Sequence, residues 1–276
     1  LAATIGAGLA VGGVTLQALF RNPLADPGLL GIASGAAVAA GLAICVFAPT
    51  PSIAGPWLVP LCAFGGALAV SRLALSVAAR AGHYDISLLL LVGIAINAIG
   101  GAVLGLLLFV ADDTALRDFT FWTLGSLSGA TWTGVLPVLA AAVVAGVTQL
   151  RAARVLNGFV LGERDAFYLG IDIERAKRQL VLATSLWVGA SVAVAGLIGF
   201  VGLVVPHLAR FVVGPNHRVL LPATALMGAT LLTAADLVAR TAVLPAELPV
   251  GIVTAALGAP LFLWLTLRHF RNGRAT

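Results

Sequence analysis

Long apolar stretches separated by short polar gaps fill the chain. They lie at roughly 1–20, 30–48, 57–79, 87–110, 133–150, 179–195, 198–213, 219–237 and 248–268. An α-helix rises about 1.5 Å per residue, so about 20 apolar residues cross the hydrocarbon core of a bilayer. The pattern predicts an all-α, polytopic membrane helix bundle with about nine spans, in a single domain over residues 1–276. The two runs between 179 and 213 are the shortest, and a tilted or partial span is an alternative there.

Positive charge lies almost entirely in alternate gaps between these runs. Of the 16 Lys and Arg residues, only Arg117 and Arg240 occupy one set of gaps, and the others lie in the second set and in the C-terminal tail. Cytoplasmic loops of membrane proteins collect positive charge. We therefore expect a cytoplasmic C-terminus, with Arg117 and Arg240 on the outer side. The first run then starts outside, which suggests a preceding helix that is missing from this chain.

Composition supports the membrane assignment. The sequence is 60% hydrophobic and 10% charged, with a formal net charge of +5, whereas soluble domains carry about 25% charged residues. The basic residues are spread over separate gaps, without the dense basic run with interleaved aromatic residues that nucleic-acid binding favours. Anionic lipid head groups are the expected partner for this charge, and nucleic acid is not.

Motifs for catalysis, metal binding and nucleotide binding are missing from the sequence. It contains no H-E-x-x-H, G-x-S-x-G or C-x-x-C, and its four histidines lack metal-ligand spacing. The only lysine, Lys177, follows Ala176, so the chain lacks the G-K-[ST] end of a phosphate-binding loop. We expect no enzyme activity, metal or cofactor in this chain. If ATP drives it, a separate subunit must bind the ATP.

The longest cytoplasmic gap, 151–178, predicts a short surface helix. Within it, the string LGERDAFYLGID places Glu163 and Asp165 in a first turn, where the helix dipole favours acidic side chains. Gly170 is suited to end that helix in a left-handed conformation. The apolar residues 166–169 need a covering partner, which is either the bundle itself or another subunit. The outer gap 111–132 likewise predicts a short re-entrant or surface helix.

Ionisable residues are sparse within the apolar runs. Asp236 and Arg240 are four residues apart near the outer end of the eighth run and are expected to pair on one helix face. An ion-coupled secondary transporter usually carries a relay of acids or histidines near mid-membrane. The near-neutral centres of the runs therefore disfavour ion coupling, and the missing nucleophile and base disfavour an intramembrane enzyme.

Five strings match one family in order and spacing. They are LQALFRNPLADPGLLGIASGA (16–36), FWTLGSLSGATW (121–132), LGERDAFYLG (161–170), GFVGLVVPHLARFVVGPNHR (199–218) and ADLVARTAVLPAELPVGIVTAALGAPLFLWL (235–265). Together they resemble the permease family of bacterial ABC importers for ferric siderophores, haem and cobalamin, over essentially the whole chain. The resemblance implies a ten-helix fold whose first helix this chain lacks. It also implies a multi-pass protein of the bacterial inner membrane.

The resemblance further implies partners. They are a second copy of the permease, two cytoplasmic ATPase subunits that bind ATP and Mg, and a periplasmic substrate-binding protein. The loop at about 155–175 resembles the helix that couples the permease to its ATPase, with the contact residues Leu161, Gly162, Glu163, Arg164, Ala166, Leu169 and Gly170. Arg240, and more weakly Arg117, would dock the binding protein.

The same resemblance places the run around 94–105 on the translocation pathway. Asn97 and Gly101 are its candidate residues, and Asn97 either faces the lumen or bonds to a neighbouring helix. The strings at 118–132 and 245–265 look most like haem permeases. The expected function is therefore ATP-driven import of haem, or a related iron chelate, by alternating access. Ferric-siderophore or cobalamin import by the same family is the alternative, and ion-coupled transport ranks behind both.

Overall fold

The computed structural model describes residues 1–47, 55–80 and 86–273, and every regular element in these ranges is a helix. The all-α prediction is confirmed. The elements are α1 (Ala2–Leu19), the 3-10 turn η1 (Pro27–Leu30), α2 (Ile32–Leu42) with the π-helical turn η2 (Ala43–Phe47), α3 (Leu58–Arg80), α4 (Ile86–Val110), α5 (Asp113–Leu124), α6 (Trp132–Arg151), α7 (Ala153–Leu161), α8 (Glu163–Tyr168), α9 (Ile173–Ala195), α10 (Val201–Val213), α11 (His217–Thr241) and α12 (Val250–Gly273).

Every predicted apolar run contains a helix. Within the described ranges, six helices are long and apolar enough to cross a membrane: α1, α3, α4, α6, α9 and α11. Shorter apolar helical segments occupy the other three runs: Ile32–Phe47, Val201–Val213 and Val250–Trp264, the last of which is the first part of α12. The short span expected at 198–213 matches α10, which has 13 residues.

The alternative of a partial span does not hold at 179–195, where the helix is longer than the apolar run. Helix α9 has 23 residues, because it begins at Ile173, where the Asp172 side chain accepts a hydrogen bond from the Arg175 amide as an N-cap. The first turns of α9 carry charged residues, so the apolar run covers only the rest of the helix, from residue 179 onward.

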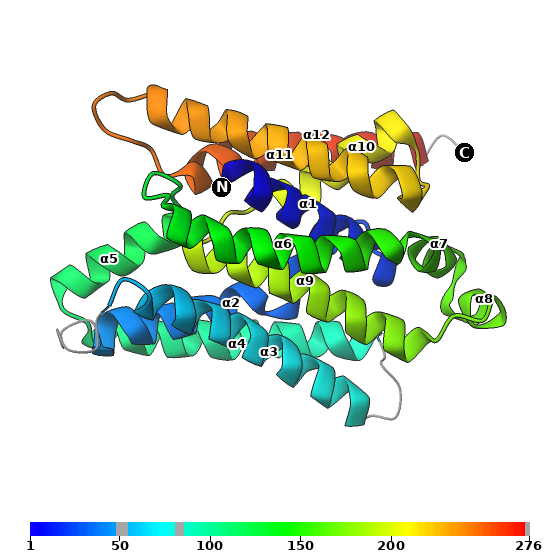
Figure 1. The fold of residues 1–276 in the computed structure, drawn as a ribbon, viewed down its shortest axis with the longest axis horizontal. Helices are drawn as coiled ribbons and strands as arrows, with labels where there is room; N and C mark the ends of the chain where they lie inside the picture. Colours follow the sequence, from blue (N-terminus) through cyan, green and yellow to red (C-terminus); the bar gives the residue numbers. More distant parts are fainter. Residues whose placement is uncertain (48–54, 81–85, 274–276) are drawn as a thin grey trace.

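Two helices form the centre of the bundle. In the most apolar 18-residue stretch of each helix, 78% of α1 and 72% of α9 is buried inside the bundle. The corresponding shares are 17% for α4 and 33% for α11. In Figure 1, α1, α6 and α9 lie between a group formed by α10, α11 and α12 and a group formed by α2, α3 and α4. Helix α5 lies at one end of the bundle, and α7 and α8 lie at the other.

Pairs of glycines bring the helices into close contact. A Cβ atom on Gly6 of α1 would overlap the Gly228 carbonyl of α11, and one on Gly228 would overlap Gly6. A Cβ atom on Gly13 of α1 would overlap the Gly202 carbonyl of α10. Such backbone contacts replace the hydrophobic drive that helices lack in lipid. They set α1 directly against two helices of the upper group in Figure 1.

Candidate functional site

The end of the bundle that carries α7 and α8 contains the segment expected to couple to an ATPase. The predicted short helix is confirmed as α8, with Glu163 and Asp165 in its first turn. Gly170 has φ 79° and its amide donates to the Phe167 carbonyl at 2.9 Å, so the helix ends as the sequence indicated. The preceding helix α7 was not expected. Its buried residues, Leu156 and Phe159 among them, form one face of a nine-residue helix, which is shorter than the apolar runs used for the prediction.

Helix α8 presents an apolar face that the rest of the described chain leaves uncovered. Ala166 is fully buried against the bundle, whereas Phe167, Tyr168 and Leu169 are 67%, 76% and 64% exposed. Leu161, at the end of α7, is 62% exposed. The bundle therefore covers only Ala166 of this face. Contiguous exposed apolar side chains of this kind mark an interaction surface.

An ion pair with a buried lysine ties α8 to the central helix α9. The Lys177 ammonium lies 2.7 Å from Glu163 Oε2, and the Lys177 side chain is 3% exposed while that of Glu163 is 40% exposed. This pair was not predicted, because the two residues belong to different helices. A buried ammonium requires such a partner, since desolvation of an uncompensated charge is costly. Glu163 thus faces inward, and Arg164 faces out.

The opposite end of the bundle carries the candidate docking arginines. The predicted pairing on α11 is confirmed: Arg240 Nε donates to Asp236 Oδ2 at 3.0 Å. Arg240 Nη2 also donates to the Leu127 carbonyl in the α5–α6 connection at 3.0 Å. The Arg240 side chain remains 39% exposed. Arg117 is exposed on α5, the short helix expected in this region.

Helix α4, assigned to the pathway, is the least buried of the long apolar helices. Asn97 Nδ2 donates to the Gly28 carbonyl of η1 at 3.1 Å, so this side chain bonds to a neighbouring element. Gly101 lies on the exposed side, and a Cβ atom there would meet nothing within 4 Å. Ile94 and Leu106 on the same helix are also exposed. The uncovered surface of α4 is therefore apolar and includes small residues.

A partly buried carboxyl group supports the element to which Asn97 bonds. Asp26 precedes η1, and its Oδ1 accepts a hydrogen bond from the Gly28 amide at 2.8 Å. Burial raises the pKa of Asp26 above its usual range, and this hydrogen bond opposes the rise. Asp26 thus holds the turn whose Gly28 carbonyl receives Asn97. Sequence patterns did not single out Asp26, since its burial depends on helices distant in the chain.

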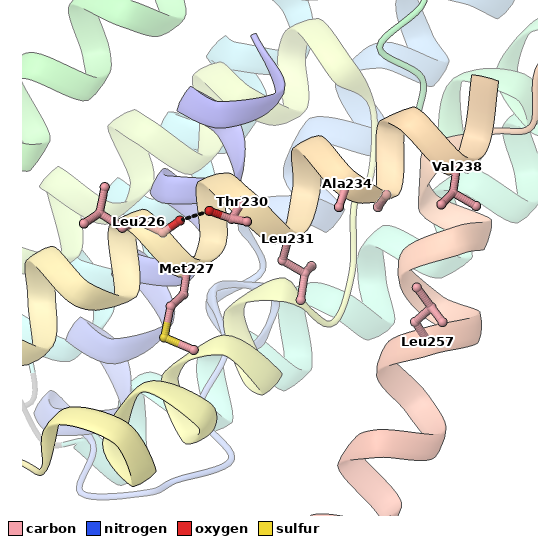
Figure 2. A pocket seen from close by; sticks show the side chains of 8 residues that line it. Leu226, Met227, Thr230, Leu231, Ala234, Val238 and Leu257 are labelled. Atoms are coloured by element: carbon pink, nitrogen blue, oxygen red, sulfur yellow. Dashed lines mark hydrogen bonds between the residues drawn. The ribbon is translucent and has the colours of Figure 1, made fainter. Parts of the chain in front are cut away.

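An apolar groove of about 450 Å³ lies between α11 and α12. Figure 2 shows its lining from successive turns of α11, facing Leu257 of α12. Its one hydroxyl group belongs to Thr230, which donates to the Leu226 carbonyl of its own helix at 2.9 Å. The groove thus offers no free donor to a polar ligand. Its main consequence is that α11 is loosely covered on the α12 side.

The described residues also contain no group of three or more His, Cys, Asp or Glu side chains placed to hold a metal ion. His83 lies outside these residues, and the side chain of His269 is likewise undescribed. Of the histidines that are described, His207 lies within 3.2 Å of the Leu203 carbonyl, and His217 lies 2.8 Å from Asn157 Oδ1. Both therefore have structural contacts on helices.

Comparisons with known proteins agree on one family. The model of the FecCD transport family matches residues 1–268. The chain is 48% identical to the hemin transport system permease protein HmuU of Yersinia pestis, over 98% of this chain and 80% of that protein. It is 46% identical to the vitamin B12 import system permease protein BtuC of Vibrio cholerae, over 97% of this chain and 80% of that protein.

A further relative and a solved structure extend the match. The cobalamin import system permease protein BtuC of Halobacterium salinarum is 45% identical, over 96% of this chain and 70% of that protein. An inward-facing structure assigned as a metal-chelate type ABC transporter superposes with a TM-score of 0.89 at 32% identity, covering 97% of this chain and 83% of the other. The chain belongs to the FecCD transport family and is a permease subunit of an ABC importer.

Proposed function

We propose that this permease imports haem, or a closely related iron chelate, into the cytoplasm. The observation that carries the proposal is the 48% identity to a hemin permease over 98% of the chain. Cobalamin permeases follow at 45% and 46% identity, so cobalamin is the second candidate. The strings at 118–132 and 245–265 favour haem.

The importer is proposed to work as a complex in the bacterial inner membrane. Two copies of this chain would enclose the pathway, with two ATPase subunits in the cytoplasm and a binding protein in the periplasm. ATP and Mg would bind to the ATPase subunits. In this orientation α7, α8 and the C-terminus are cytoplasmic, in agreement with the distribution of Lys and Arg.

The exposed face of α8 is the proposed contact with the ATPase. Leu161 and Leu169 supply apolar area, and Arg164 supplies charge at its edge. Ala166 and Glu163 face the bundle, so they hold the helix while its other face binds. Gly162 (φ 129°) and Gly170 (φ 79°) allow the sharp backbone turns that isolate α8 from α7 and α9.

The outer end of the bundle is the proposed docking surface for the binding protein. Arg240 bonds through Nε and Nη2 within the chain, and its exposed remainder can receive a carboxylate of the partner. Arg117 on α5 adds positive charge to the same end of the bundle. Acidic residues on the binding protein would complement both, which favours fast and salt-dependent association.

The exposed side of α4 is the proposed lining of the pathway, with Gly101 on its surface and Asn97 anchoring it to η1. A wide, weakly polar pathway suits a large ligand that needs no tight site in the permease. ATP binding would draw the ATPase subunits together and displace α8, and the helices around the pathway would then tilt. Selection of the ligand would rest mainly with the binding protein.

Ligand-stimulated ATPase activity of the reconstituted complex tests this function. The binding protein is loaded in turn with haem, a ferric siderophore and cobalamin, and the unloaded protein is the control. We expect the largest stimulation with haem. Greater stimulation by cobalamin would reject haem as substrate. Transport without any ATPase subunit, abolished by an ionophore, would favour the ion-coupled alternative.

A further inference from the structure

A hydrogen-bonded junction joins α7 to the first turn of α11. Asn157 Oδ1 accepts from the His217 amide at 2.9 Å and lies 2.8 Å from His217 Nδ1. Asn157 Nδ2 donates to Asn216 Oδ1 at 3.0 Å, and that oxygen also accepts from the Arg218 amide. Since Asn157 Oδ1 can only accept, His217 Nδ1 carries its hydrogen. One amide thus uses both of its polar groups to hold the start of α11.

The junction is buried on its His217 side, whereas Asn157 is partly buried and Asn216 is exposed. His217 is only 2% exposed, and Leu156 and Phe159 beside Asn157 are fully buried. Polar bonds in such an environment are costly to break, because each group left unpaired keeps its desolvation penalty. Helix α7 leads through Gly162 directly into α8, the proposed contact with the ATPase. A displacement of α8 therefore reaches the inner end of α11 through Asn157.

Helix α11 connects this junction to the proposed docking surface. It crosses α1 in backbone contact at Gly6 and Gly228. Gly228 lies near the middle, about 16 Å from His217 and about 18 Å from Arg240 along the helix. The groove of Figure 2 leaves α11 loosely covered toward α12. Buried side chains continue on both sides of this backbone contact, from Leu220 to Ala239, so α11 packs along its length with its backbone contact to α1 near the middle.

We propose that α11 is a lever that pivots on α1 and that Asn157 is the positioning residue that couples it to α7 and α8. A tilt about the Gly6–Gly228 crossing moves the two ends of α11 in opposite directions. At the outer end this motion shifts Arg240 and its bond to the Leu127 carbonyl. Movement of the ATPase would in this way alter the docking surface for the binding protein. The inference rests on the proposed function.

The test compares Asn157→Leu with Gln149→Leu in the reconstituted complex. Gln149 is a matched control, because its Nε2 makes a buried 2.9 Å bond to Thr184 that joins α6 to α9 and lies outside the α7–α11 junction. Two quantities are measured: the ratio of stimulated to basal ATPase activity with the haem-loaded binding protein, and the change in binding-protein affinity between nucleotide-free and ATP-bound states. If a residue has only a structural role, its substitution would lower the yield of assembled complex and leave both ratios unchanged.

We expect Asn157→Leu to assemble and to reduce both ratios about fivefold or more, which is the usual range of coupling between sites. Gln149→Leu should keep both ratios. Wild-type ratios in assembled Asn157→Leu, or equal losses in the control, would overturn the inference. If Asn157→Leu does not assemble, Asn157→Asp replaces it: the carboxylate keeps the bonds to His217 and loses the donor to Asn216, and ratios at least twofold below wild type are expected. Unchanged ratios there would also overturn the inference.

A wild-type complex without stimulation by haem or cobalamin would instead contradict the proposed function.

Discussion

The two ends of the bundle both expose residues suited to a partner, but they are anchored in different ways. At the α8 end, an apolar face is held from behind by the Glu163–Lys177 pair, in which the lysine is buried. At the α5 end, Asp236 and one carbonyl hold Arg240, and here the cation itself is 39% exposed. The first arrangement suits a permanent contact that transmits force. The second suits a charged contact that forms and dissociates in each transport cycle.

The largest effect on this comparison is expected when the Glu163–Lys177 pair is removed. Glu163→Ala takes the 2.7 Å carboxylate partner from a lysine that is 3% exposed. We expect a loss of about 2 kcal/mol in the free energy of unfolding, because the buried ammonium loses a charge-assisted bond. Unfolding by SDS titration in mixed micelles measures it. Lys177→Met, which removes the buried charge itself, should cost less; a larger cost for Lys177→Met would contradict the explanation.

The exposed face of α8 is tested next. Leu169→Asp places a charge on a side chain that is 64% exposed. If this face binds the ATPase, burial of an unpaired charge there should weaken association at least tenfold, which equals about 1.4 kcal/mol. Co-purification and titration of the ATPase subunit measure this. Leu116→Asp on α5, an exposed leucine at the other end, is the matched control and should retain wild-type association.

Reversal of the outer charge comes third. Arg240→Glu should lower the affinity for the binding protein about fivefold at low salt, with most of the effect on the association rate. It also places an acid beside Asp236, so Arg240→Gln separates loss of the positive charge from local repulsion. Surface binding kinetics at two salt concentrations provide the measurement. An unaltered affinity at low salt for both variants would reject the docking role.

The smallest effect is expected at Arg117. Its side chain is exposed on α5, and exposed charges contribute about 1 kcal/mol or less. Arg117→Glu should therefore reduce binding-protein affinity about twofold, and the reduction should disappear at high salt. If Arg117→Glu reduced the affinity more than Arg240→Glu, Arg117 would be the main docking residue.

Local features were well predicted because they depend on neighbours in the chain. The end of α8 at Gly170 follows from the lack of a Cβ atom, and the Asp236–Arg240 pair follows from the four-residue spacing of one helix face. The start of α9 at Ile173 was missed, because its first turns are charged. The orientation in the membrane and the missing first helix stay predictions.

Contacts between helices were outside the reach of such patterns. The junction of Asn157 with His217, the bond of Asn97 to Gly28 and the bond of Arg240 to Leu127 join residues that are 60, 69 and 113 positions apart. Gly101 and Gly105 have the G-x-x-x-G spacing typical of helix contacts in membranes, yet a Cβ atom at either position would meet nothing within 4 Å. The close approach of α1 to α11 uses Gly6 and Gly228, and neither of these glycines has another glycine four residues away.

By itself, the sequence determined that the chain is a helical membrane protein, where its apolar runs lie, and which short segments carry charge between them. These features follow from hydropathy and from spacing within a single helix. The tertiary structure alone decided that Lys177 is buried against Glu163, that Asn157 holds α11, and that the outer face of α8 is left uncovered. The physical reason is that burial and pairing depend on how helices cross, and many crossings are compatible with the same apolar pattern.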